Sequence, residues 1–222
     1  MRSFTLFLTV ILIGSACKRD PKPVFHFDYF GMTEGRYVVY DVMDIVHDDD
    51  ALIHHDTARY QLKTVWGELY TDNEGREGRI FRRYVRPQST DPWVLQDVWY
   101  GLIDGIRGEL IEENQRRVKL VFSPTIEKEW DANAYNPDPE LECYYADIHE
   151  PYSISGSSFD STVTVEQDEF ESAIDTSRKY EVWAKDIGLV YRHDRYVFYG
   201  FAQPEVQSGH EIFYRYLSSG YE

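Results

Sequence analysis

The chain has few cysteines, many fewer basic than acidic residues, and no long apolar run. Its 222 residues include two Cys, which excludes a small scaffold held together by several disulfides. It has 23 Lys and Arg against 39 Asp and Glu, a formal net charge of −16. This balance excludes general nucleic-acid binding, because phosphate backbones are bound by basic surfaces. A hydrophobic content of 42% excludes a mainly disordered chain.

Motifs that carry common enzyme chemistry are also missing from the sequence. It contains no Gly-x-Ser-x-Gly, no His-Glu-x-x-His and no glycine-rich phosphate loop with its lysine. We therefore expect a non-catalytic protein without a cofactor, and we predict no catalytic, cofactor-binding or metal-binding residue. A hydrolase that uses the carboxylates of residues 124–175 remains the less favoured alternative, because the separation of two acids cannot be derived from sequence.

The longest apolar run lies at the N-terminus and predicts export. It covers residues 4–13, about half of the roughly 20 residues needed to span a bilayer. Arg2 precedes it and Gly14-Ser15-Ala16 follow it, which is the anatomy of a secretory signal peptide. Cys17 comes next, so the segment resembles the lipobox of bacterial lipoproteins, in which this cysteine is lipidated. The alternative is an ordinary signal peptide cleaved near Ala16, which leaves a free thiol.

These features divide the chain into three predicted parts. Residues 1–16 form the signal peptide, residues 17–27 a lipid-anchored tether, and residues 28–222 a single β-rich domain. The acyl anchor makes the membrane a partner and places the protein in the cell envelope, at the periplasmic face or the cell surface.

Alternating and β-branched segments predict strands along the whole domain. Residues 57–70 alternate most cleanly, with Leu62, Thr64 and Trp66 on one face. Further strands are expected at 36–46, 79–85, 93–100, 109–112, 117–122, 143–149, 152–155, 161–166, 180–185, 189–199 and 211–217. Residues 167–176 could hold one short helix. The predicted fold is mainly β, a single antiparallel curved sheet, open barrel or sandwich with at most one or two short helices.

Four segments together resemble a family of uncharacterised bacterial lipoproteins. Residues 28–40 read DYFGMTEGRYVVY and residues 181–191 read EVWAKDIGLVY; residues 130–136 (WDANAYN) and 159–165 (FDSTVTV) are similar to further parts of such proteins. The resemblance implies a structural use of these motifs, with Gly35 and Gly188 in turns and the aromatic residues in the core. It implies an exported location and no particular activity.

Two segments have the residue types of a metal site. Residues 47–56 read HDDDALIHHD, but Asp48, Asp49 and Asp50 on successive positions of an extended chain cannot face one point, so a solvated hairpin loop is favoured. Residues 131–142 fit a calcium loop only superficially and are interpreted as a surface loop. Whether residues 47–56 or the acidic segment 124–175 binds a metal stays open. Cys143 has no adjacent basic group, so a small buried residue is favoured over a nucleophile.

The expected function is a membrane-anchored binding or carrier module for an apolar or amphipathic ligand. Its 18 Tyr and five Trp support this, because a curved sheet leaves a concave aromatic face. The alternative is a structural or interaction lipoprotein that docks onto an envelope protein. A carrier requires a deep apolar cavity, whereas a docking module requires a filled core and an exposed apolar patch.

Overall fold

The computed structural model describes residues 24–200 and 205–222. The predicted signal peptide and Cys17 lie outside the described residues, as does most of the tether. Within the described ranges, no helix is long and apolar enough to cross a bilayer.

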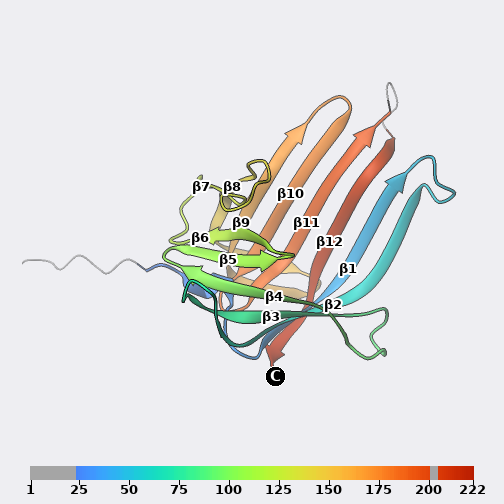
Figure 1. The fold of residues 1–222 in the computed structure, drawn as a ribbon. Coiled ribbons are helices and arrows are strands. Elements are labelled where there is room, and N and C mark those ends of the chain that lie inside the picture. The colour runs from blue at the N-terminus through green and yellow to red at the C-terminus, as the bar shows by residue number, and fades with distance from the viewer. Residues whose placement is uncertain (1–23, 201–204) are drawn as a thin grey trace, which may run out of the picture.

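The described chain forms one antiparallel sheet of twelve strands (Figure 1). The strand order is β6-β5-β4-β3-β2-β1-β12-β11-β10-β9-β8-β7, which leaves β6 and β7 at the two edges. The predicted mainly β fold is therefore confirmed, in its curved, barrel-like form with one open seam between the edges. The strands are β1 (Arg36–Asp48), β2 (His55–Thr71), β3 (Glu77–Arg86), β4 (Val94–Asp104), β5 (Arg107–Glu112), β6 (Gln115–Val121), β7 (Glu129–Asp131), β8 (Glu142–Ile154), β9 (Ser157–Glu171), β10 (Asp175–Ala184), β11 (Gly188–Tyr199) and β12 (Val206–Tyr221).

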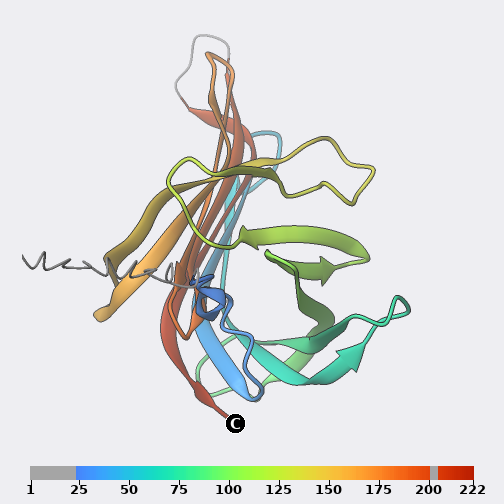
Figure 2. The ribbon, with the colours of Figure 1, turned by 90° about the vertical axis from the view of Figure 1, so that its left-hand side faces the viewer.

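Two groups of strands enclose the interior (Figure 2). Strands β1, β2 and β8–β12 form a long, nearly continuous wall, and the shorter β3–β6 curve across one side of it. The first and last strands meet inside this wall, since β1 pairs with β12 from Arg36 opposite Tyr221 to Asp48 opposite Ser208. Strand β2 turns Leu62, Thr64 and Trp66 inward, as its alternation predicts.

The segment before β1 packs against the turn between β10 and β11, and we call this end of the molecule the base. The 3-10 turn η1 (Phe27–Phe30) carries Tyr29 and Phe30, which are both completely buried. Gly31 follows in the left-handed region at φ 65°, and a Cβ there would lie 2.4 Å from the carbonyl oxygen of Ile187. The N–H of Asp186 donates to the carbonyl of Asp28 at 3.0 Å. Residues 28–31 and 186–188, here called the base join, therefore bring two of the motif segments of the sequence into direct backbone contact.

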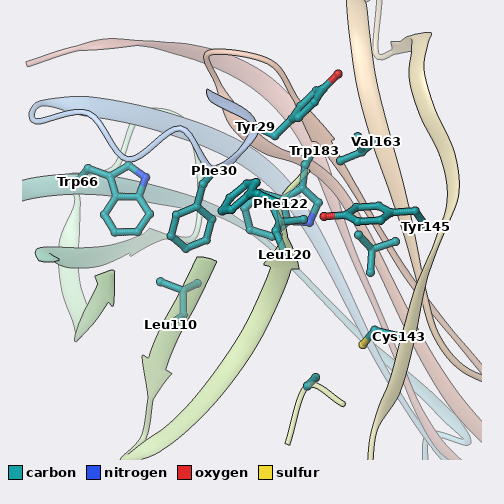
Figure 3. Close-up of a cluster of buried hydrophobic side chains, with 12 residues drawn as sticks. Tyr29, Phe30, Trp66, Leu110, Leu120, Phe122, Cys143, Tyr145, Val163 and Trp183 are labelled. Atoms are coloured by element: carbon teal, nitrogen blue, oxygen red, sulfur yellow. The ribbon is translucent and has the colours of Figure 1, made fainter. Parts of the chain in front are cut away.

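Phe30 is one of the central residues of a large hydrophobic cluster (Figure 3). Its ring lies 5.4 Å from that of Trp66 and 5.8 Å from that of Trp183, so it joins β2 to β10. Further buried members come from β5, β6, β8 and β9 and from the residues that directly follow β6 and β7: Leu110, Leu120, Phe122, Ala132, Cys143, Tyr145, Val163 and Val165. Burial of these large side chains stabilises the fold by about 1.5–3 kcal/mol each.

The helix predicted at residues 167–176 is wrong. Strand β9 continues through Glu171 and β10 begins at Asp175, and Phe170 stands opposite Ser177 in their ladder. The segment is polar because it forms an exposed hairpin end beyond the interior, where alternation is not enforced by burial. Among the described residues, η1 is the only helical element.

Candidate functional site

The interior between the long wall and β3–β6 is almost filled. It leaves a cavity of about 50 Å³, which has room for a few water molecules, whereas ligand pockets typically measure about 300–1,000 Å³. Aromatic and aliphatic side chains form most of the lining, among them Phe30, Leu62, Trp66, Phe81, Trp99, Leu110 and Trp183. The deep apolar cavity that a lipid carrier requires is therefore not present among the described residues.

One wall of this cavity is charged. Lys119 on β6 reaches across to β10, where its Nζ lies 2.9 Å from Oε1 of Glu181, and it also lies 3.7 Å from Glu112. Glu181 is 2% exposed and accepts a second hydrogen bond from the indole of Trp183 at 3.2 Å. Burial acts to lower the pKa of Lys119, but Glu112 and Glu181 outweigh it and raise that pKa. Lys119 therefore stays cationic at neutral pH.

A groove of about 450 Å³ lies outside Lys119, along the seam. One side consists of β6 and the 132–141 loop, and the other of the inner face of β9–β11. The groove shares Glu112, Lys119 and Arg192 with the interior cavity, so the two spaces meet at these charged side chains. We call this space the seam groove.

The walls of the seam groove carry both charges. Arg192 donates to Asp194 at 3.0 Å, and Lys179 lies 3.3 Å from Asp168. Burial acts to raise the pKa of Asp194, but Arg192 and Lys179 lower it, so its carboxylate is ionised at neutral pH. The groove thus offers fixed donors and acceptors along its walls, and the aromatic lining of the interior cavity lies behind Glu112, Lys119 and Arg192.

One backbone hydrogen bond and several side chains, rather than a strand ladder, close the seam beside the groove. The N–H of Val118 donates to the carbonyl of Ala132 at 3.0 Å. The side-chain amide of Asn136 bonds the backbone of Arg116 twice, accepting from its N–H and donating to its carbonyl, both at 2.9 Å. The hydroxyl of Tyr145 lies 3.1 Å from both the N–H and the carbonyl of Val121. The indole of Trp130 donates to the carbonyl of Val118 at 3.0 Å. These bonds occupy edge groups of β6 that would otherwise accept another strand.

The predicted site residues fall in different places. Cys17 lies outside the described residues. Cys143 is buried in the hydrophobic cluster, and burial together with Glu181 raises the pKa of its thiol to about 12. Cys143 is thus the small buried residue that the sequence favours, and its thiol stays protonated at neutral pH.

The segment 47–56 forms the end of the β1–β2 hairpin, which is the hairpin loop that the sequence favours. One premise of that prediction is wrong, however, because Asp48, Asp49 and Asp50 do converge, with one oxygen of each within 4.8 Å of the others. They lie in a turn, where successive residues can face one point, and all three are exposed. An exposed acidic turn of this kind is common without an ion.

The calcium-like segment 131–142 is a loop along the seam. One carboxylate oxygen of Asp131 accepts from the N–H groups of Asn133 and Leu141, at 2.7 and 2.9 Å. This carboxylate therefore holds the loop in shape instead of facing a free site.

Two solved structures are similar to most of the chain. One is a "putative lipoprotein" from Parabacteroides distasonis, with 10% sequence identity and a TM-score of 0.44, covering 86% of this chain and 98% of that one. The other is a "putative exported protein with YmcC-like fold" from Bacteroides fragilis, with 12% identity and a TM-score of 0.40, covering 84% and 97%. No family model and no curated protein matches the chain. At these TM-scores the similarities say nothing about ligand or activity.

The sequence alone did not reveal the charged residues of the groove. Lys119 and Glu181 are 62 positions apart, and Lys179, Arg192 and Asp194 lie in ordinary alternating strands. The one available signal lies at the end of β10, where Glu181 directly precedes three apolar residues, Val182, Trp183 and Ala184.

Proposed function

We propose that the protein is an exported lipoprotein, anchored through Cys17 at the periplasmic face or the cell surface, and that it is a non-catalytic binding module. Its ligand is amphipathic and occupies the seam groove. The observation that carries this proposal is the junction at Glu112, Lys119 and Arg192, where a groove of ligand size meets the aromatic interior.

The geometry favours a polar amphipathic ligand over a purely apolar one. The groove is lined by paired charges that hydrogen-bond polar groups, and the apolar space behind them is about 50 Å³. A ligand therefore places its polar part between β6 and β9–β11 and turns only a small apolar part toward the interior. A long acyl chain does not fit this arrangement.

The test is native mass spectrometry of the full chain, extracted in mild detergent without chelator. We expect an organic molecule to co-purify with the wild type. In Lys179→Glu the fraction of protein that carries it should fall about tenfold or more. Lys185→Glu is the matched control, because Lys185 forms a comparable pair with Asp28 at 3.5 Å but lies outside the groove. Retention of the mass in Lys179→Glu, or a bare mass for the wild type, contradicts the groove proposal.

A second candidate is docking onto an envelope protein. The outer face of β2–β4 carries a broad concave surface in which Tyr70, Val98 and Tyr100 lie among polar and charged side chains, and the first two are exposed. Exposed aromatic and aliphatic side chains that are rimmed by polar residues over a filled core are typical of an interaction surface. A bare wild-type mass in the same experiment would favour this function.

A further inference from the structure

Exposed apolar side chains gather where the described chain begins. Phe25, Phe27, Ile106 and Ile126 are all exposed, the last two by 43% and 50%. We call these four residues the anchor-end patch. Figure 1 shows the start of the described chain at the same end of the molecule as the end of β6.

Buried Phe122, just after β6, connects the members of this patch. Its ring lies 4.8 Å from that of Phe27 in an edge-on arrangement, and its N–H donates to the carbonyl of Ile106 at 2.7 Å. Lys128 closes the loop that carries Ile126 and donates to the carbonyl of Phe122 at 3.2 Å. The patch is therefore held on a rigid part of the core although its outer side faces solvent.

The short stretch of chain between Cys17 and the patch indicates that the patch contacts the lipid surface. Cys17 precedes Val24 by seven residues, and seven residues span at most about 25 Å when fully extended. With acyl chains on Cys17 inserted in the bilayer, the start of the domain cannot lie farther than this from the lipid surface. This step rests on the anchoring proposed above.

Charge also favours this end of the molecule. The residues between Cys17 and Val24 include Lys18, Arg19 and Lys22 against Asp20, whereas the whole chain carries −16. At the patch itself the ammonium group of Lys128 stands between the exposed Glu127 and Glu129, so the basic charge at this end comes from the tether. The basic tether is attracted to anionic headgroups, which repel the acidic remainder.

We infer that the anchor-end patch rests in the headgroup region of the bilayer and fixes the orientation of the domain. The exposed aromatic and aliphatic side chains enter the boundary between headgroups and acyl chains, as in other interfacial segments. The β1–β2 hairpin, at the opposite end in Figure 1, then points away from the membrane.

The experiment places a fluorophore at each end of the acylated full chain in phosphatidylcholine vesicles that contain doxyl-labelled lipid. Ile126→Cys reports on the patch, and Leu52→Cys, which is fully exposed on the β1–β2 hairpin, is the matched control. Cys143 does not interfere, because it is buried with its pKa raised to about 12. We expect quenching at position 126 to exceed quenching at position 52 several-fold.

Vesicle flotation separates the two proposals. Ile106→Asp in the Ile126→Cys background should reduce the quenching while the chain still floats with the vesicles. A chain that floats but shows equal quenching at positions 52 and 126 overturns the seating and leaves the anchor intact. A chain that does not float, or a Cys17→Ser variant that floats as well as the wild type, overturns the anchor and the seating with it.

Discussion

Two contacts between distant segments close the molecule, the base join and the seam. They differ in how far they depend on backbone atoms and on side chains. At the base join, backbone meets backbone, with Gly31 against Ile187 and the N–H of Asp186 bonded to Asp28. At the seam, a single backbone bond from Val118 to Ala132 is accompanied by the side chains of Asn136, Trp130 and Tyr145, which bond the edge of β6. A close backbone contact tolerates no added atom, whereas a join made largely by side chains loses strength one bond at a time.

The largest expected effect is at the base join. Gly31→Ala should destabilise the fold by more than about 3 kcal/mol, because its Cβ would lie 2.4 Å from the carbonyl oxygen of Ile187. Gly75→Ala is the control for backbone conformation alone. Gly75 also has a positive φ, 79°, but nothing lies within 4 Å of its added Cβ, so its cost should be about 1–2 kcal/mol. Urea unfolding measures both, and equal losses would show that the close approach is not rigid.

The seam should respond less strongly to the loss of one side-chain group. Tyr145→Phe removes a buried hydroxyl that serves both the N–H and the carbonyl of Val121, so it should cost about 1–3 kcal/mol. Amide exchange at Val121 should become faster. The matched control is Tyr216→Phe, whose hydroxyl bonds only the nearby Ser219, at 3.0 Å. If Tyr145→Phe leaves exchange at Val121 unchanged, the hydroxyl does not hold the seam.

The smallest expected effect is a pH dependence of stability that belongs to the base join and not to the seam. His149 lies 2.6 Å from the hydroxyl of Tyr29 at the base, and its pKa is lowered by burial and then by His26 and Lys185. Because the folded state disfavours the imidazolium, stability should fall slightly as the pH drops below about 6.5.

Thermal unfolding at about pH 7.5 and pH 5.5 tests this expectation. His149→Gln should reduce the difference in Tm between the two pH values. Tyr145→Phe should leave that difference as in the wild type, because neither Tyr145 nor Asn136 titrates in this range. A His149→Gln protein with the full wild-type difference would assign the pH dependence to other groups.

Local pattern was enough to predict most strands but not how they are joined. The alternation of residues 57–70 is enforced by burial of Leu62 and Trp66, so β2 could be derived directly. The tip at residues 167–176 has no such constraint, and a helix was wrongly predicted there. The turn of Asp48–Asp50 depends on a local backbone conformation that composition does not specify.

A further reason explains why the candidate site could not be predicted from the sequence. The seam groove exists because β3–β6 curve across the wall and bring Lys119 beside Glu181. That approach depends on the aromatic core around Phe30, whose partners come from β2 and β10. Neither spacing nor periodicity records contacts over such distances in the chain, so the charged residues appear as ordinary polar positions of strands.

The pairing of β1 with β12 has a consequence for how the fold is completed. If the chain emerges from the N-terminus, β1 has only β2 as a neighbour until the final strand arrives, and one whole edge of thirteen residues waits unpaired. The two halves of the sheet, β1–β6 and β7–β11, can each form locally, but only β12 connects them. The pairing of β1 with β12 therefore joins the two ends of the chain, a contact of high sequence separation that is expected to form slowly and to leave the edge of β1 open to aggregation until it does.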